Sequence, residues 1–272
     1  MTDKKFIFIG GLHRSGTTLI HKILRSHPGI SGFHNTGVPM DEGQLLQTVY
    51  PAAKVFGGPG RFAFNPASFM DEGHPLATPE NASKLFQEWS RHWDLTKEYL
   101  LEKSPPNLVR TRFLQKLFPQ SIFVMIFRHP IAVAYATHKW APDPTPSLIE
   151  HGLRCYERFQ QDIRFLRRVY VLRYEDFVRE PDLHMQTLLD WIGIERFTFD
   201  DAVLPDINSK YFAVWKAERP ILSQAEFKDA SAPFGTFRDF ETRANAFGYS
   251  INEPDTLLPC SLFGPHDPTN IL

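Results

Sequence analysis

The residue pattern best suited to chemistry lies near the amino terminus. A short apolar run, residues 6–9, leads into the sequence G-L-H-R-S-G-T-T at residues 11–18. The glycine spacing is that of a phosphate-binding P-loop, G-x-x-x-x-G-K-[ST], in which backbone amides and a helix amino terminus bind an anion. Thr17 stands where such a loop has its lysine. Since that lysine spans the β- and γ-phosphates of a nucleotide, this loop is predicted to hold a shorter anionic group, with Arg14 supplying positive charge. The simplest alternative is a glycine turn in which Ser15 or Thr17 merely caps a helix.

Two further basic residues follow apolar runs. Arg128 comes directly after residues 122–127, so it is predicted at the carboxyl end of a buried strand, where open α/β sheets bind their ligands. A simple ion pair is the alternative role for Arg128. Lys103 comes after the short apolar run 99–101 and Glu102. For Lys103 the alternative is a solvated surface lysine.

These residues need a sheet to bring them together. Continuous apolar runs of strand length, such as residues 6–9, 122–127 and the shorter 170–172, are typical of parallel strands buried on both faces. Helical patterns alternate with them. Predicted helices follow the first loop up to His27-Pro28, run from Val109 to Leu117, extend over 147–168, and span 181–193. The alternation predicts an α/β fold with three layers, a P-loop-like central parallel sheet flanked by helices.

Two stretches lack a regular period. Residues 57–80 are rich in Gly and Pro and too long for a simple connection, so we expect an acceptor-side lid. Residues 252–272 are polar and Pro-rich, and we expect them to wrap the surface as a tail. With no repeat and no domain linker in the sequence, residues 1–272 are predicted to form a single domain.

Composition excludes several classes of protein. Lys and Arg total 30 against 31 Asp and Glu, a formal net charge of −1, whereas a nonspecific nucleic-acid binder needs an excess of cations. No run approaches the ~18–20 apolar residues of a membrane-spanning helix. The first apolar run is interrupted by glycines and followed by His13 and Arg14, unlike a signal peptide. Cys155 and Cys260 lie far apart and form no metal-binding spacing, which favours a reducing, cytoplasmic location.

The loop at residues 13–19, H-R-S-G-T-T-L, resembles the 5′-phosphosulfate loop of the sulfotransferases that use 3′-phosphoadenosine 5′-phosphosulfate (PAPS). The likeness is greatest to tyrosylprotein sulfotransferases and their bacterial relatives, whose loop reads R-S-G-T-T. It extends from Phe6 to about Gly193, with weaker matches at residues 210–215. The resemblance implies transfer of a sulfuryl group from PAPS to a hydroxyl or amine, which leaves the 3′,5′-bisphosphate. The resemblance also implies that this transfer needs no metal ion.

The resemblance also assigns roles to individual residues. It implies that PAPS is bound by Arg14, Ser15, Gly16, Thr17, Thr18, Arg128, Tyr174 and Lys210, with Tyr174 beside the adenine and residues 208–211 covering the nucleotide. Lys103 would contact the bridging oxygen of the leaving group. In the family, a serine eight residues after the arginine shares the 3′-phosphate, but here that position is Ala136. Thr137, next to it, is the candidate replacement. Tyr174 could equally be a core residue.

The base that removes the acceptor proton is the open question. An ungapped comparison with the G-E-E-T segment of the tyrosylprotein relatives places His34 and Asn35 at the two glutamate positions. Asn35 cannot be a base, whereas an imidazole with an ordinary pKa near ~6.5 can. Glu42 is the competing candidate, because the loop around Pro39 can return its carboxylate to the same place. Both His34 and Glu42 therefore remain candidates for the base.

Two other functions are compatible with a phosphate loop. A P-loop kinase or NTPase is disfavoured because the loop lysine and a Walker-B carboxylate are missing. A non-catalytic nucleotide-binding protein is the other alternative, suggested by Ala136. The acceptor is expected to be a small molecule or a peptide, and an apolar component of its pocket is suggested by four aromatic residues: Phe62, Phe64, Phe69 and Trp89. The sequence leaves the identity of the acceptor and the oligomeric state open.

Overall fold

The computed structural model describes residues 3–200, 203–205, 207–224 and 237–267. A six-stranded sheet with the order β2-β3-β1-β4-β5-β6 forms its centre. The strands are β1 (Lys5–Gly11), β2 (Ile30–Gly32), β3 (Tyr99–Lys103), β4 (Ile122–Phe127), β5 (Val169–Arg173) and β6 (Gly264–His266). Strands β1 to β5 are parallel, and β6 runs antiparallel to β5. The predicted α/β fold with a central parallel sheet is confirmed.

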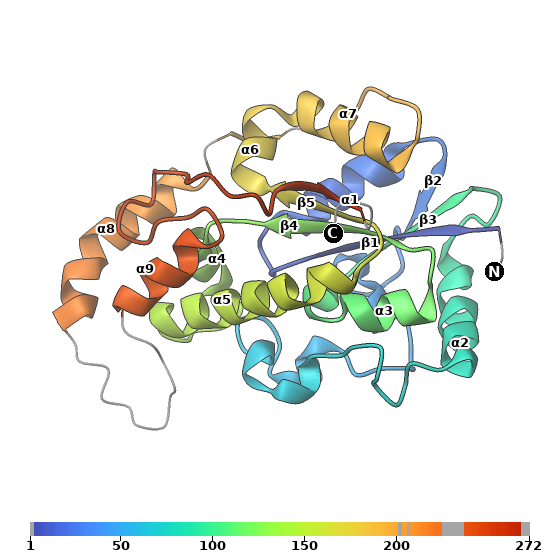
Figure 1. Ribbon diagram of the computed structural model, residues 1–272, viewed down its shortest axis with the longest axis horizontal. Coiled ribbons are helices and arrows are strands. Elements are labelled where there is room, and N and C mark those ends of the chain that lie inside the picture. Colours follow the sequence, from blue (N-terminus) through green and yellow to red (C-terminus); the bar gives the residue numbers. More distant parts are fainter. Residues whose placement is uncertain (1–2, 201–202, 206, 225–236, 268–272) are drawn as a thin grey trace.

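Helices cover both faces of this sheet, as Figure 1 shows. They are α1 (Thr17–Ser26), α2 (Pro79–Trp89), α3 (Thr111–Leu117), α4 (Pro130–Thr137), α5 (Thr145–Asp162), α6 (Tyr174–Arg179), α7 (Pro181–Ile192), α8 (Ser209–Gln224) and α9 (Phe237–Asn245). Alternate side chains of β1 point into two hydrophobic cores. Phe6 and Phe8 pack with α2, α3 and α5, whereas Ile7 and Ile9 pack with α1 and α7. The sheet is therefore the middle layer, and the helices packed on its two faces through these cores are the two outer layers.

The observed helices differ from the predicted ones both in where one of them ends and in their number. The helix predicted over 147–168 ends at Asp162, and a 3₁₀ turn at Ile163–Phe165 follows, because the chain becomes extended at Leu166 to enter β5. Helix α2 was not predicted, although Thr78 caps its first turn and Pro79 occupies its first position, a recognisable start signal. Residues 57–70 contain 3₁₀ turns at Phe62–Phe64 and Pro66–Ser68, and this stretch packs into the core, since Phe62 and Met70 are fully buried.

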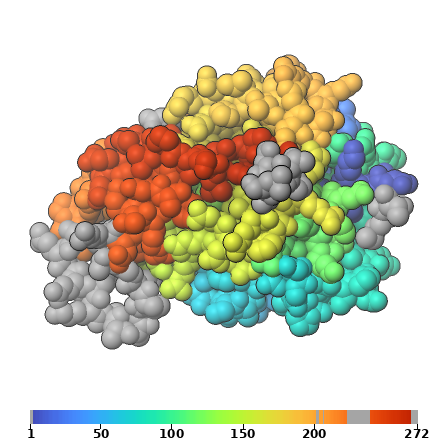
Figure 2. All heavy atoms as spheres, viewed as in Figure 1, coloured from blue at the N-terminus to red at the C-terminus, as the bar shows by residue number. Residues whose placement is uncertain are grey.

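The carboxyl-terminal segment does more than wrap the surface. Its residues Gly264–His266 form β6 at the edge of the sheet. In the space-filling view of Figure 2, residues 237–267 fill the surface between α5 and the pair α6 and α7. The tail prediction missed this strand because three residues containing Pro265 carry little strand signal. Within the described ranges, none of the helices has the length and apolar character that a membrane crossing requires.

Candidate functional site

The carboxyl ends of four parallel strands meet at one edge of the sheet. Lys103 of β3 pairs in register with Ile9 of β1, and Gly11 pairs with Ile126 of β4. A cavity of about 390 Å³ opens at this edge. The predicted site residues that line it are Arg14, Gly16, Thr17, Thr18, Glu42, Arg128, Tyr174 and Lys210. The cavity therefore gathers residues that are more than 190 positions apart in the sequence.

The loop between β1 and α1 leads from a strand end into a helix amino terminus, an arrangement that suits anion binding. Its Ser15 N–H donates to the carbonyl of Leu12 at 3.0 Å, and α1 begins at Thr17. Gly16 occupies the cap position and no side chain caps the helix, so the predicted alternative of a Ser15 or Thr17 cap is wrong. The first hydrogen bond of the helix runs from the Leu19 N–H to the carbonyl of Gly16 at 3.0 Å, so the N–H groups of Thr17 and Thr18 lie ahead of it at the open end of α1. The Ser15 hydroxyl is buried and has no hydrogen-bond partner within the described structure.

Gly16 is required by the geometry of this loop. Its φ is +101°, in the left-handed region that residues with a side chain rarely adopt. A Cβ at this position would also lie 2.7 Å from the ring of Tyr174. Tyr174 thus packs directly on the loop, and both line the same cavity.

Backbone strain is concentrated around the cavity. In the described part of the chain, the non-glycine residues with positive φ are Arg14, Asn35, Met40 and Asp41. They belong to two segments, the phosphate loop and residues 35–41, and both supply residues that line the cavity. Such strain persists only where surrounding contacts enforce it, and it is often found at functional sites.

Lys103 and Glu42 form the charged pair of the site. The Lys103 ammonium donates to the carbonyl of Met40 at 2.8 Å and lies 3.4 Å from Oε1 of Glu42. The Lys103 side chain is fully buried, and burial lowers its pKa, while the neighbouring carboxylate of Glu42 acts in the opposite direction. Gln44 donates to the other Glu42 oxygen at 2.6 Å and holds the carboxylate in place. The pair is therefore fixed in position, with Glu42 lining the cavity and Lys103 buried behind it.

The structure distinguishes the two candidates for the base. Glu42 lines the cavity, whereas His34 is exposed and does not. The reason lies one residue earlier, because the Phe33 ring is fully buried and stacks on Trp93 at 4.8 Å between ring centroids. Phe33 thereby anchors the chain on the core side and leaves His34 on the surface. The geometry supports Glu42 and brings no support to His34.

Arg128 enters the cavity from the end of β4. Its Nη1 donates to the carbonyl of Arg14 at 2.7 Å, and its guanidinium lies 4.4 Å from the centre of the Tyr174 ring. Arg128 thus contacts both the loop that follows β1, through Arg14, and the ring of Tyr174. Lys210, in the first turn of α8, is exposed and lines the same cavity.

Thr137 is not brought to this cavity. It is buried at the end of α4 and lines a separate, very small cavity next to Gly60 and His151. Ala136 does not line the main cavity either. The structure therefore does not support the predicted replacement of the missing serine by Thr137, because the Thr137 side chain lies beside Gly60 and lines the small cavity instead of the one that Arg128 lines.

Some residues of the site were not predicted. His13 lines the cavity, and burial lowers its pKa to about 4, so the ring is neutral at physiological pH. Trp140 lines it too, and the Arg14 guanidinium lies 5.1 Å from its ring centre. The position of His13 within the loop motif was the sequence signal that could have identified it as a site residue. The aromatic residues predicted for an acceptor pocket do not line this cavity, and Trp89 instead packs in the core against Phe8 and Phe118.

Comparison with known proteins gives concordant matches. A model described as "Sulfotransferase family" matches residues 7–200. Protein-tyrosine sulfotransferase 1 of Danio rerio is 24% identical over 212 residues, which cover 74% of this chain and 56% of the relative. Protein-tyrosine sulfotransferase 2 of Gallus gallus is 25% identical over 219 residues, covering 74% and 54%. The chain thus spans about half the length of the curated relatives it matches.

A solved structure supports the fold independently. The sulfotransferase domain from the curacin biosynthetic pathway superposes with a TM-score of 0.51 at 16% sequence identity, covering 91% of this chain and 98% of that domain. At this identity the likeness concerns the fold alone. The family match, by contrast, includes β1 from Ile7 onward, β2 to β5, the loop that follows β1, Glu42, Lys103, Arg128 and Tyr174. Because it spans more than half of the sequence, the chain belongs to the sulfotransferase family.

Proposed function

We propose that this protein transfers the sulfuryl group of PAPS to a hydroxyl or amine of a small molecule or peptide. The observation that carries the proposal is the Lys103 and Glu42 pair, which lies beside a phosphate loop that lacks the P-loop lysine. The loop amides supply an anion site, Lys103 supplies the positive charge, and Glu42 supplies a base. The names of the two tyrosine sulfotransferase relatives make a phenol a reasonable first acceptor to test.

The residues around the cavity suit the parts of PAPS. The phosphosulfate would lie at residues 14–18, where the N–H groups of Thr17 and Thr18 precede the first hydrogen bond of α1. Arg128 would hold the 3′-phosphate on the opposite side. Tyr174 would contact the adenine, since it lines both this cavity and a neighbouring one of about 310 Å³. These assignments of donor groups to residues are part of the proposal.

The proposed reaction is an in-line displacement at sulfur. The acceptor oxygen or nitrogen forms a bond to sulfur while the bond from sulfur to the 5′-phosphate oxygen breaks. Glu42 takes the acceptor proton, and the Lys103 ammonium stabilises the charge that develops on the released phosphate oxygen. The products are the sulfated acceptor and adenosine 3′,5′-bisphosphate. No step requires a metal ion, and a cytoplasmic location remains a prediction from the sequence.

Nucleotide-dependent thermal stability separates this function from a kinase. We expect PAPS or adenosine 3′,5′-bisphosphate, in the presence of EDTA, to raise the melting temperature by roughly 5–10 °C at one hundred times its Kd. The linkage free energy at that concentration is about 2.7 kcal/mol, which gives such a shift for a chain of this size. ATP with Mg²⁺ should shift the melting temperature much less, because the loop lacks the lysine for the β- and γ-phosphates. A larger shift with ATP and Mg²⁺ would favour the kinase instead.

A further inference from the structure

The side chain of Arg128 is held from two directions. Its Nε and Nη2 donate to Oδ1 of Asn208 at 2.9 and 2.7 Å, and its Nη1 donates to the carbonyl of Arg14 at 2.7 Å. A guanidinium has five N–H groups. These contacts use three of them, so one N–H on each Nη nitrogen remains for a ligand. Arg128 is thus fixed in orientation and still able to donate two hydrogen bonds.

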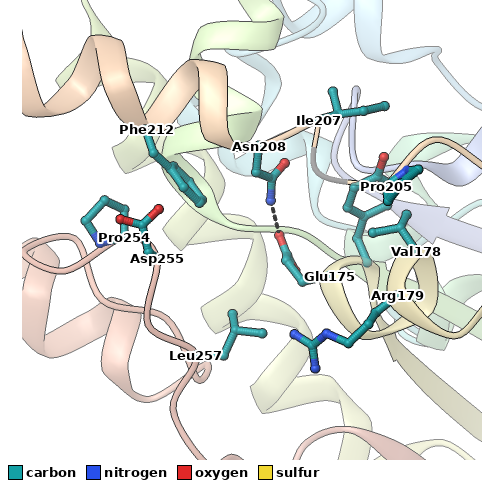
Figure 3. Close-up of a pocket in the computed structure, with 11 residues that line it drawn as sticks. Glu175, Val178, Arg179, Pro205, Ile207, Asn208, Phe212, Pro254, Asp255 and Leu257 are labelled. Carbon is teal, nitrogen blue, oxygen red and sulfur yellow. Dashed lines mark hydrogen bonds between the residues drawn. The ribbon is translucent and has the colours of Figure 1, made fainter.

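Asn208 is itself fixed by Glu175. The Asn208 Nδ2 donates to Oε1 of Glu175 at 2.7 Å, the contact drawn in Figure 3. The same oxygen accepts from the backbone N–H of His129 at 2.9 Å, and the other carboxylate oxygen accepts from Tyr249 at 3.3 Å. Because the amide nitrogen must face the carboxylate, the amide oxygen must face Arg128. The direction of the amide is therefore set by Glu175.

The neutral amide preserves the charge of Arg128. A carboxylate at position 208 would orient the guanidinium equally well, but it would also form an ion pair that competes with an anionic ligand. In the described part of the chain, no carboxylate lies within ion-pair distance of Arg128. Asn208 is buried at 6% exposure, so water competes little for its contacts.

The same residue places helix α8. The backbone carbonyl of Asn208 accepts from the N–H groups of Tyr211 and Phe212, and α8 begins at the next residue. Lys210 and Tyr211, which line the cavity, are carried by this first turn. Asn208 therefore connects α8, which lies beyond the part matched by the family model, to Arg128 and the phosphate loop.

We propose that Asn208 is a positioning residue for the 3′-phosphate of the donor: its amide oxygen, directed by Glu175, presents Arg128 to the nucleotide. The inference rests on the proposed use of PAPS. It implies that the preference for a nucleotide with a 3′-phosphate depends on a residue that itself makes no contact with that phosphate.

Calorimetric titration with adenosine 3′,5′-bisphosphate and adenosine 5′-phosphate tests this role. Asn208→Ala and Asn208→Ser should weaken the bisphosphate about tenfold and leave the monophosphate within about twofold, because Arg128 loses its orientation only toward the 3′-phosphate. The serine variant retains a residue type favoured at the start of a helix. Tyr135→Phe is the matched control, since it removes the hydrogen bond from Tyr135 to Glu218 of α8 without touching Arg128. Arg128→Ala provides the reference for a protein that no longer prefers the bisphosphate over the monophosphate.

The outcomes separate this inference from the proposed function. If the wild-type protein binds both nucleotides equally, the use of PAPS is wrong. If the wild type and Tyr135→Phe prefer the bisphosphate and both Asn208 variants keep that preference, the positioning role is wrong while the function stands. Equal weakening of both nucleotides in the Asn208 variants would assign Asn208 a purely structural role. Melting temperatures of all variants establish that each is folded.

Discussion

Replacing Lys103 by methionine should lower kcat by a factor on the order of 10² or more, with little change in nucleotide affinity. The ammonium is buried beside the phosphate loop, and its contact with the leaving oxygen strengthens only as charge develops there. Methionine fills most of the same volume, which limits the damage to the core. Steady-state kinetics and calorimetric titration with adenosine 3′,5′-bisphosphate measure the two quantities separately.

An exposed lysine provides the control for Lys103. Lys22 lies on the outer face of α1 and does not line the cavity, so Lys22→Met should be nearly neutral. Turnover close to that of the wild type in Lys103→Met would remove Lys103 from the mechanism. A loss of nucleotide affinity as large as the loss of kcat would instead make Lys103 an ordinary binding residue.

The Glu42→Gln variant should lose about 10²–10⁴-fold in turnover and retain its affinity for PAPS, as expected for a missing general base. The amide keeps the size of the carboxylate and an oxygen that can accept from Gln44, so the surrounding structure should change little. The His34→Gln variant is the matched comparison, and we expect a small effect because His34 lies on the surface. Small effects in both variants would show that neither residue is the base.

The sequence predicted the parts of the site that depend on local patterns. The phosphate loop is contiguous, and a strand before it and a helix after it are sufficient to define its geometry. Arg128 and Lys103 follow from one rule, because both end buried parallel strands and such ends meet at one edge of the sheet. No long-range packing had to be known for these three predictions.

The remaining parts depend on packing between distant segments. The geometry favours Glu42 over His34 because Phe33 stacks on Trp93, about sixty residues away in the sequence, and leaves His34 on the surface. The placement of Thr137 depends on which face of α4 packs against Gly60. The contact of Asn208 with Arg128 joins residues separated by 80 positions. A single sequence contains no signal for such contacts.

Transfer of ³⁵S from labelled PAPS is the most direct test of the central claim, that this cavity catalyses sulfuryl transfer through Lys103 and Glu42. The purified protein would be incubated in EDTA with a panel of phenols, alcohols, amines and tyrosine peptides, and products separated from PAPS. We predict a labelled product from at least one acceptor class, formed without metal and reduced by about 10²-fold or more in Glu42→Gln. Tight binding of PAPS with no labelled product across the panel would contradict this account and favour a non-catalytic nucleotide-binding protein.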